Sequence, residues 1–380
     1  MKLGIFMYSL AGGGAERQAS YILDYCVKNN IDVHLILMNN TIKYELPEGL
    51  PIHYIEKSKH DENGIIKALK IPLLAHKYSK LVKQLQLTHS VSLLTRPNFI
   101  NVIAGKITSY NFKIIINELA YPSLQYSYKG FQSTFNKLLI KLLYKKSDLV
   151  ISNSEGNASD LIANFNVPKQ IMNVVHNPID LDKIKKINPV ESFFDNNTFN
   201  IITLGRLDVG KNHIMLIEAI HKVNNPLVRL YIFGDGVMQK ELMLLIKKLN
   251  LGTHVFLVGF DPNPYKYLKA SDLFIFGSNH EGFPNVILEA MSCGLPILTT
   301  NCQSGPSEIM ELNIAKNDLM ITDYGILVPI KNSDLMAKGI RYFIDNKKYM
   351  KFCKKNGQSR IKDFEKESIL RAYVNLIRTI

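Results

Sequence analysis

The feature that most constrains the fold is a pair of apolar runs, residues 273–276 and 297–300, which lie 20 residues apart. Each run has the length of a strand and lacks the alternation of apolar and polar residues that a half-exposed strand shows. A continuously apolar run of this length is typical of a buried parallel strand. Between them, Pro284 is suited to the first turn of a helix, and Gly294 with Pro296 ends that helix. The sequence therefore predicts a strand, a helix and a second strand of one parallel sheet.

Two carboxylates in this segment are placed to meet a ligand. Glu281 follows the first strand, in the loop at its carboxyl end, and Glu289 lies inside the helix. Between them, the backbone N–H groups of Gly282, Phe283 and Asn285 open the helix and favour an anion. The two carboxylates can accept hydrogen bonds from sugar hydroxyls, and they lie on both sides of a site for phosphate. This arrangement predicts a nucleotide-sugar pocket. An ordinary strand–loop–helix joint with two surface glutamates would contain the same residues.

The segment from Glu281 to Glu289 closely resembles the E-x7-E motif of the retaining family-4 glycosyltransferases. The resemblance implies a GT-B fold of two facing Rossmann-like domains, with a C-terminal helix that crosses back to the first domain. It also implies that Glu281 contacts the donor sugar and that Glu289 holds the ribose hydroxyls of the nucleotide. The residues that would bind the donor between them are Gly282, Phe283, Pro284 and Asn285.

A glycine run near the N-terminus, residues 12–14, follows a predicted strand at 2–8 and precedes a predicted helix at 18–28. Such a turn lets backbone N–H groups approach a ligand closely, although a tight turn alone would also use these glycines. The run is not G-x-G-x-x-G, and the second strand ends in Asn39-Asn40 instead of an acidic residue. A dinucleotide oxidoreductase is therefore disfavoured. The family resemblance implies that Gly13, Gly14 and Glu16 face the donor diphosphate and the acceptor.

Two cations follow a predicted strand at 199–204, in the segment Gly205-Arg206-Leu-Asp-Val-Gly-Lys211. Arg206 and Lys211 suit a diphosphate leaving group, although two solvated surface cations would give the same pattern. The family has Gly-Arg-x4-Lys here, with both cations on the donor phosphates. The same resemblance places the turns at Gly234 and Phe260 beside the nucleotide base. Because no Asp-x-Asp motif follows a suitable strand, we expect no metal requirement.

The net charge of +13 is concentrated in the first half of the chain. Between residues 63 and 147 there are thirteen Lys or Arg residues and one carboxylate, Glu118. Such a surface binds phosphate, and without nucleic-acid motifs it favours an anionic membrane. Two basic amphipathic helices are predicted, at 72–85 and 130–146, and their leucines could instead pack into the core. The lysines expected to meet the membrane are Lys137, Lys141, Lys145 and Lys146.

Glu118 is predicted to reach the carboxyl edge of the first sheet, after a strand at 113–117. Where this chain has Leu119, family-4 enzymes often carry a histidine that is thought to contact donor or acceptor. Glu118, with Tyr121 shortly after it, could bind the acceptor, or it could be an ordinary loop glutamate.

The chain of 380 residues is long enough for two domains, and its composition, 46% hydrophobic and 21% charged, is globular. We predict a first domain at 1–178 with a returning helix at 365–380, and a second at 179–364 that begins with a polar linker at 183–200. No apolar stretch reaches the length of a membrane-spanning helix. The scattered cysteines, Cys26, Cys293, Cys302 and Cys353, show no metal or disulfide spacing and fit a reducing cytosol.

These observations predict a cytoplasmic glycosyltransferase, peripheral on the inner face of the plasma membrane. It would transfer a hexose or N-acetylhexosamine from a nucleotide sugar, expected to be UDP-linked, to a lipid-linked or surface-polysaccharide acceptor. Its partners would be the donor, that acceptor and an anionic membrane surface, with no nucleic acid. A non-catalytic membrane protein that binds nucleotide sugars and a GT-B-fold sugar-nucleotide epimerase remain as alternatives, because fold does not fix chemistry.

Overall fold

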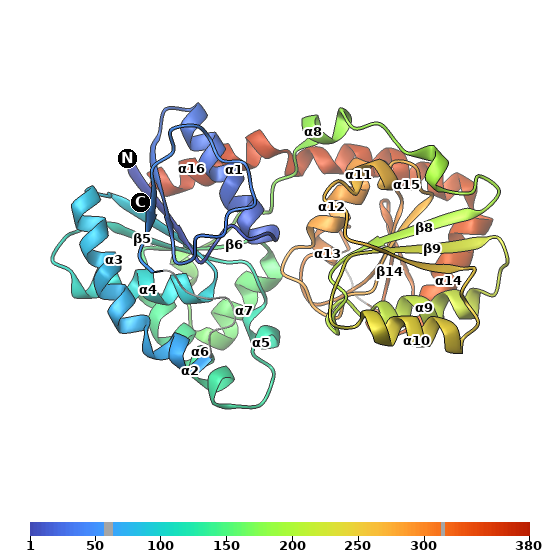
Figure 1. The fold of residues 1–380 in the computed structure, drawn as a ribbon, viewed down its shortest axis with the longest axis horizontal. Helices are drawn as coiled ribbons and strands as arrows, with labels where there is room; N and C mark the ends of the chain where they lie inside the picture. Colours follow the sequence, from blue (N-terminus) through green and yellow to red (C-terminus); the bar gives the residue numbers. More distant parts are fainter. Residues whose placement is uncertain (57–63, 313–315) are drawn as a thin grey trace. The chain divides into compact units, whose positions relative to one another are not determined.

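The structure is a computed structural model that describes residues 1–56, 64–312 and 316–380 (Figure 1). The chain divides into two compact units. The first consists of Met1–Pro178 and Lys366–Ile380, and the second of Ile179–Glu365. Asn63, the first residue of the basic segment 63–147, lies outside the described residues.

The first unit is built on a seven-stranded sheet in which every described pair of neighbours is parallel. Its order is β3-β2-β1-β4-β5-β6-β7. Because both faces are covered, most residues of its central strands are buried, and β4 contributes the buried polar residues Ser90 and Ser92. The strands are β1 (Lys2–Met7), β2 (Asp32–Leu37), β3 (Ile52–Tyr54), β4 (His89–Leu93), β5 (Lys113–Glu118), β6 (Leu149–Ser152) and β7 (Met172–Val174).

Helices cover both faces of this sheet. One core forms beneath α3, α4 and α6, and the other beneath α1 and the C-terminal helix α16 (Lys366–Arg378). Within α16, Leu370, Tyr373, Val374 and Ile377 are buried, and the Tyr373 hydroxyl donates to Asn117 Oδ1 at 3.0 Å. The remaining helices of the unit are α1 (Gly14–Lys28), α2 (Gly64–Leu69), α3 (Ile71–Leu85), α4 (Thr95–Ile107), α5 (Pro122–Gln125), α6 (Phe131–Leu143), η1 (Tyr144–Lys146), α7 (Glu155–Phe165) and η2 (Lys169–Ile171).

The second unit repeats this architecture, with the strand order β10-β9-β8-β11-β12-β14-β13. Only the edge strand β13 is antiparallel to its neighbour among the described pairs. The strands are β8 (Phe199–Leu204), β9 (Val228–Phe233), β10 (Val255–Gly259), β11 (Leu273–Phe276), β12 (Ile297–Thr300), β13 (Met320–Ile321) and β14 (Gly325–Val328). The helices are α8 (Leu181–Lys185), η3 (Glu191–Phe193), α9 (His213–Val223), α10 (Gln239–Lys248), α11 (Tyr265–Leu268), α12 (Asn285–Ser292), α13 (Pro306–Ile309), α14 (Ser333–Asp345), α15 (Lys347–Arg360) and η4 (Ile361–Phe364).

The predicted class, two Rossmann-like α/β domains with a C-terminal helix that returns to the first, is confirmed. Three local predictions were wrong. Helix α1 starts at Gly14 instead of residue 18, so the glycine run forms its first turn. Pro284 precedes α12 as its N-cap. The polar segment 183–200 is not a free linker, because it contains η3 and part of α8 and buries Ile184 and Phe194 in the second core.

The strand order identifies where ligands are expected in each unit. In an open parallel sheet, ligands bind beyond the carboxyl ends of the two strands between which the winding direction reverses. In the second unit these strands are β8 and β11, and in the first they are β1 and β4. The loops after β8 and β11 contain Arg206, Lys211 and Glu281. The strand order therefore brings these three predicted residues to one edge.

Candidate active site

An ion pair joins the two loops at the switch point of the second sheet. Lys211, from the loop after β8, pairs through its Nζ with Oε1 of Glu281, from the loop after β11. The same ammonium lies 5.4 Å from the centroid of the Phe276 ring, at the end of β11. Both charged side chains are largely shielded from water, so the pair is screened less than a surface ion pair. One cation and one carboxylate are thus fixed side by side at this edge.

Asp208 holds the loop that carries the cations. Its Oδ1 accepts the backbone N–H of Lys211 at 3.0 Å, and its Oδ2 lies 3.7 Å from Nε of Arg206. The Arg206 side chain is otherwise exposed. One carboxylate therefore orients the backbone before Lys211 and stays close to the guanidinium, while most of Arg206 is accessible to a ligand.

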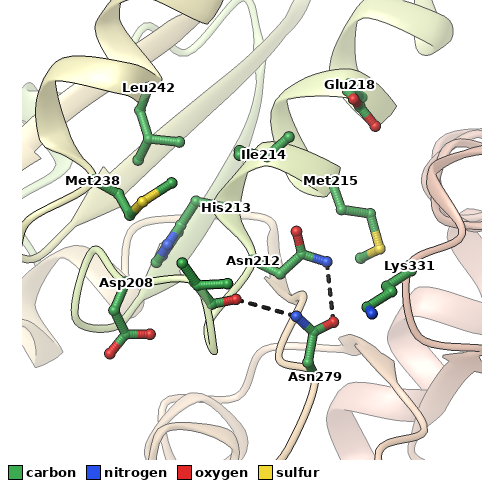
Figure 2. Close-up of a pocket in the computed structure, with 11 residues that line it drawn as sticks. Asp208, Asn212, His213, Ile214, Met215, Glu218, Met238, Leu242, Asn279 and Lys331 are labelled. Carbon is green, nitrogen blue, oxygen red and sulfur yellow. Dashed lines mark hydrogen bonds between the residues drawn. The ribbon is translucent and has the colours of Figure 1, made fainter. Parts of the chain in front are cut away.

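The end of β11 holds this loop from the other side. The carbonyl of Gly210 accepts the backbone N–H of Asn279 at 2.8 Å and the Ser278 hydroxyl at 3.2 Å. Figure 2 shows the amide of Asn279 hydrogen-bonded to Asn212 and to a backbone carbonyl, that of Val209. A loop that is held at several backbone positions presents its cations with little reorganisation, which is what electrostatic catalysis requires.

The residues after Glu281 are supported by a loop that follows β12. Ser304 donates its hydroxyl hydrogen to the carbonyl of Gly282 at 2.8 Å. Gly305 has a φ of +89°, and a Cβ there would lie 2.4 Å from Cδ of Pro284. Only glycine fits this contact without displacing the start of α12.

Helix α12 begins at this support and contains Glu289. Asn285 is its first residue, and Glu289, in its second turn, is buried. Phe283 is also buried and packs against Phe364, with ring centroids 5.5 Å apart. Of the residues predicted to bind the donor here, Phe283 therefore directs its ring into the protein, which leaves its backbone for a ligand.

The turns after β9 and β10 lie against the turn after β8. Gly234 has a φ of +138°, and a Cβ there would lie 2.0 Å from the carbonyl oxygen of Gly205. The N–H of Gly234 also donates to the carbonyl of Gly259 at 2.9 Å. Next to Gly259, the aromatic side chain of Phe260 is exposed. The structure therefore brings Gly234 and Phe260 to the same edge as Arg206.

A cavity of about 230 Å³ lies behind the cation loop, at the start of α9 (Figure 2). Asp208 and Asn279 line it, together with His213, which is 3% exposed. Burial lowers the pKa of His213 to about 4, so the imidazole is neutral at physiological pH. Its Nδ1 has no hydrogen-bond partner among the described residues. His213 thus adds no charge beside Lys211.

In the first unit, the predicted glycine turn lies at the carboxyl edge of β1, beside the switch point. Gly13, with a φ of +143°, is the N-cap of α1, and Gly14 is the first residue of that helix. The hydroxyl of Tyr44 accepts the Gly13 N–H at 3.2 Å and donates to its carbonyl at 2.8 Å. Glu16 lies in the first turn of α1, where a carboxylate is favoured by the helix dipole.

Glu118 is the last residue of β5, at the carboxyl edge of the sheet, and it is 1% exposed, so it is not the ordinary loop glutamate that was the alternative to acceptor binding. Its Oε2 accepts the hydroxyl of Tyr144 at 2.5 Å and that of Thr95 at 3.4 Å. Burial raises the pKa of this carboxyl to about 7. Its carboxylate faces the interior and does not reach solvent, whereas Tyr121, the N-cap of α5, is partly exposed.

The predicted membrane lysines belong to α6 and η1. Lys141, Lys145 and Lys146 are exposed, and Lys137 is half-buried. Within the described ranges, no group of three or more His, Cys, Asp or Glu side chains could hold a metal ion. In the same ranges, no helix has the length and hydropathy to span a membrane.

Comparison with known proteins identifies the family. The model for Glycosyltransferase Family 4 matches residues 12–183, and the model for Glycosyl transferases group 1 matches residues 184–360. Over 370 residues the chain is 40% identical to the N-acetylgalactosamine-N,N'-diacetylbacillosaminyl-diphospho-undecaprenol 4-alpha-N-acetylgalactosaminyltransferase of Campylobacter jejuni, with 97% of each chain covered. The chain belongs to the family-4 glycosyltransferases.

Other relatives agree with this family-4 glycosyltransferase in sequence or fold. An uncharacterised glycosyltransferase of Methanocaldococcus jannaschii is 32% identical over 377 residues, which cover 88% of this chain and 89% of the relative. Anabaena HepE in complex with UDP has a TM-score of 0.81 at 20% identity, over 100% of both chains. Sucrose-phosphate synthase from Thermosynechococcus elongatus has a TM-score of 0.83 at 16% identity, over 100% of this chain and 99% of the other. At such identities the two solved structures establish the GT-B fold of this glycosyltransferase and nothing finer.

Sequence reasoning missed the residues that hold the site of this glycosyltransferase together. Asp208 lies inside the Gly-Arg-x4-Lys segment, but it was assigned no role from the sequence. Its position two residues after Arg206 was a signal that it could pair with that cation. Asn279 acts through contacts with the backbone of the loop after β8, which depend on which strands are neighbours, and no local pattern reveals these contacts.

Proposed function

We propose that this glycosyltransferase transfers a sugar from a UDP-linked donor to a polyprenyl-diphosphate-linked acceptor at the cytoplasmic membrane face, with retention of configuration. The observation that carries the proposal is the cluster of Arg206, Lys211 and Glu281 at the switch point of the second sheet. The solved relative from Anabaena holds UDP, which supports the donor class. The Campylobacter relative is named for a diphospho-undecaprenol acceptor, which supports the acceptor class.

The reaction needs stabilisation of a departing nucleoside diphosphate. Arg206 and Lys211 supply positive charge to the two phosphates, and the backbone N–H groups that start α12 add a partial positive charge. Because Asp208 and Asn279 hold the cation loop, this charge is oriented before the substrate binds. On the family resemblance, the donor phosphate itself accepts the proton of the attacking hydroxyl, and no enzyme nucleophile is needed.

The two glutamates have separate roles in this proposal. Glu281 receives a hydrogen bond from a hydroxyl of the donor sugar, and its pair with Lys211 fixes its direction. Glu289, buried in α12 eight residues further along the chain, holds the ribose hydroxyls. Gly282, Pro284 and Asn285, with the backbone of Phe283, bind the donor between them, and the turns at Gly234 and Phe260 contact the base.

In the first unit, Gly13, Gly14 and Glu16 are proposed to bind substrate at the start of α1, and Tyr121 to contact the acceptor. Glu118 is assigned a positioning role instead of direct contact, because it is buried against Tyr144 and Thr95. Its hydrogen bonds tie the end of β5 to the start of α4, and Tyr121 follows three residues later.

A transfer assay with defined substrates tests the proposal. UDP-N-acetylhexosamines and UDP-hexoses are supplied with undecaprenyl-diphosphate oligosaccharides in anionic vesicles. We expect transfer from one UDP-sugar, a product with the anomeric configuration of the donor, and full activity in EDTA. Donor binding without transfer to any acceptor would favour a non-catalytic binding protein, and a new UDP-sugar formed without acceptor would favour an epimerase.

A further inference from the structure

A second cavity, of about 220 Å³, lies in the first unit, where residues of α2, α4 and α6 line it. Thr95 and Arg96, at the start of α4, follow β4, and the segment around Tyr126 follows β5. The cavity therefore opens near the carboxyl edge of the first sheet, where a substrate of this domain is expected. None of the predicted site residues lines it.

Aromatic rings form much of its wall. The rings come from two segments that are distant in sequence: Phe99 in α4, and Tyr126, Tyr128, Phe131 and Phe135 within residues 126–135. Phe131 and Phe135 stack on each other, with centroids 5.7 Å apart and an interplanar angle of 19°. Phe131 is 74% exposed and Tyr128 is also exposed, so apolar surface is left open to solvent at the entrance. Such a cavity suits an apolar chain, because an aromatic wall removes hydrocarbon from water.

Cations accompany these rings. Lys67 and Arg96 line the same cavity. Arg96 reaches across to α2, where its Nη2 donates to the carbonyl of Lys67 at 3.1 Å. A guanidinium and an ammonium beside an apolar cavity suit a ligand with a phosphate at one end and a hydrocarbon chain at the other.

The backbone before Arg96 is strained. Leu94 has a φ of +75° and a ψ of 155°, a region that is almost restricted to glycine. This conformation lies at the switch point of the first sheet, between the end of β4 and the start of α4. The strain therefore occurs where Thr95 and Arg96 enter the cavity wall.

From the entrance, an apolar stripe continues along α6. Phe131, Phe135, Leu138 and Leu142 are spaced by four, three and four residues, which puts them on one face of the helix. Leu138 is 51% exposed and Leu142 is 44% exposed, whereas Ser133 and Ile140, on the opposite face, are buried. Lys141 and Lys145 lie beside this stripe. A face of this composition fits the boundary between lipid headgroups and hydrocarbon.

We infer that the cavity between α2, α4 and α6 binds the first isoprene units of the lipid-linked acceptor, with the α6 stripe in contact with the bilayer from which that lipid comes. The inference rests on the proposed function for the class of acceptor. Lys67 and Arg96 meet the diphosphate, and the aromatic wall meets the branched chain. The rest of the chain continues along the stripe into the membrane, because the cavity holds only its first units.

Binding by the full-length protein tests this without catalysis. The probes are farnesyl diphosphate, which has three isoprene units, inorganic diphosphate, which has the head alone, and dodecyl phosphate, which has a straight chain. Each methylene removed from water strengthens binding about fourfold. In calorimetry we therefore expect farnesyl diphosphate to bind at least tenfold tighter than either of the others. Equal affinity for inorganic diphosphate would overturn the apolar site, and equal affinity for dodecyl phosphate would overturn its preference for isoprene.

Two matched double variants locate the site. Tyr128→Ser with Phe131→Ser removes two exposed rings at the cavity, and we expect it to lose the tenfold preference for farnesyl diphosphate. Leu138→Ser with Leu142→Ser removes two exposed apolar side chains of α6 outside the cavity, and it should retain that preference while binding vesicles more weakly. An unchanged circular dichroism spectrum and an unchanged melting temperature check that both variants are folded. An equal loss of farnesyl diphosphate binding in the two variants would overturn the assignment.

Kinetics separate this inference from the proposed function. With soluble acceptors that differ only in the number of isoprene units, KM should fall as the first units are added, and the cavity variant should abolish that dependence. A KM that is independent of chain length, in an active enzyme, sinks the cavity assignment alone. No transfer to any acceptor, with farnesyl diphosphate still bound, sinks the proposed function alone.

Discussion

Lys211 and Glu281, 70 residues apart in sequence, form an ion pair at the carboxyl edge of the second sheet, and each is the nearest charge that the other has at this site. Neither residue can therefore be changed without altering the environment of its partner. Removing one partner leaves an unpaired charge in a shielded position, which is more damaging than removing both.

This relationship predicts non-additive kinetics. Lys211→Ala should lower kcat by about 10²–10³, since one preorganised electrostatic contact contributes about 2.7–4 kcal/mol to transition-state stabilisation. Glu281→Ala should lower kcat at least as strongly, to a residual rate that can still be measured, and should spare UDP binding. The double variant should lose much less than the sum of the two free energies, as measured by a double-mutant cycle on kcat/KM. Additive losses would show that the pair does not act as a unit.

The proposed ribose contact of Glu289 is tested by ligand binding. Glu289→Ala should weaken UDP binding by about 1–3 kcal/mol, through loss of a charge-assisted hydrogen bond. Calorimetry with free UDP measures this, and Glu289→Gln separates loss of charge from loss of shape. Unchanged affinity in the alanine variant would remove the ribose assignment.

The close contact at Gly305 predicts a backbone effect on the donor site. Gly305→Ala should lower the melting temperature and donor affinity together, because the added Cβ meets Pro284 and the positive φ is strained. Gly252→Ala is the matched control, since a Cβ there meets nothing within 4 Å. Equal melting temperatures and equal donor affinities for the two variants would contradict the proposed support of α12.

Glu118 predicts a pH dependence of stability. Burial raises its folded-state pKa from 4.5 to about 7, so between these values the folded state binds more protons than the unfolded state. Its contribution therefore falls as pH rises from about 4.5 to 7, by up to about 3 kcal/mol. Glu118→Gln should raise the melting temperature more at pH 8 than at pH 5. An equal change at both pH values would mean that the carboxyl stays ionised.

Membrane attraction is tested with the lysines of α6 and η1. Changing Lys137, Lys141, Lys145 and Lys146 to Ser should reduce sedimentation with anionic vesicles at low salt, because each lysine near such a surface contributes about 1 kcal/mol. The comparison variant changes Lys77, Lys80 and Lys83 to Ser, in α3, which is another basic helix of the first unit. High salt should release the wild-type protein. Equal binding to neutral vesicles would rule out an electrostatic origin.

The sequence predicted the fold well where one local pattern decides an element. The segments that form β8, β11 and β12 were predicted as strands at these positions, because buried parallel strands are continuously apolar. Helix α1 was predicted too short, since glycines are poor helix formers, yet Gly14 is accepted as its first residue. Segment 183–200 was taken for a linker from its polarity, but its few apolar residues are the ones that pack.

The candidate site shows the same division. Arg206, Lys211 and Glu281 were selected from chemistry and spacing, and the strand order brings them to one edge. The burial of Glu118 could not be predicted, because it depends on Tyr144 reaching across from another helix segment. The leucines of α6 were expected either to face the membrane or to pack into the core, and the structure shows both arrangements. Leu139 and Leu143 pack against the core, whereas Leu138 and Leu142 remain exposed.

Helix α16 has a consequence for how this chain is made. Leu370, Tyr373, Val374 and Ile377 complete one core of the first unit, although they are synthesised after the whole of the second. At about 5–20 residues per second, the ribosome takes roughly 10–40 s to produce residues 179–365. During that interval the nascent first unit has an uncovered apolar face beside α1. A truncated chain that ends at residue 365 should therefore aggregate or require a chaperone, and supplying α16 as a separate peptide should rescue it.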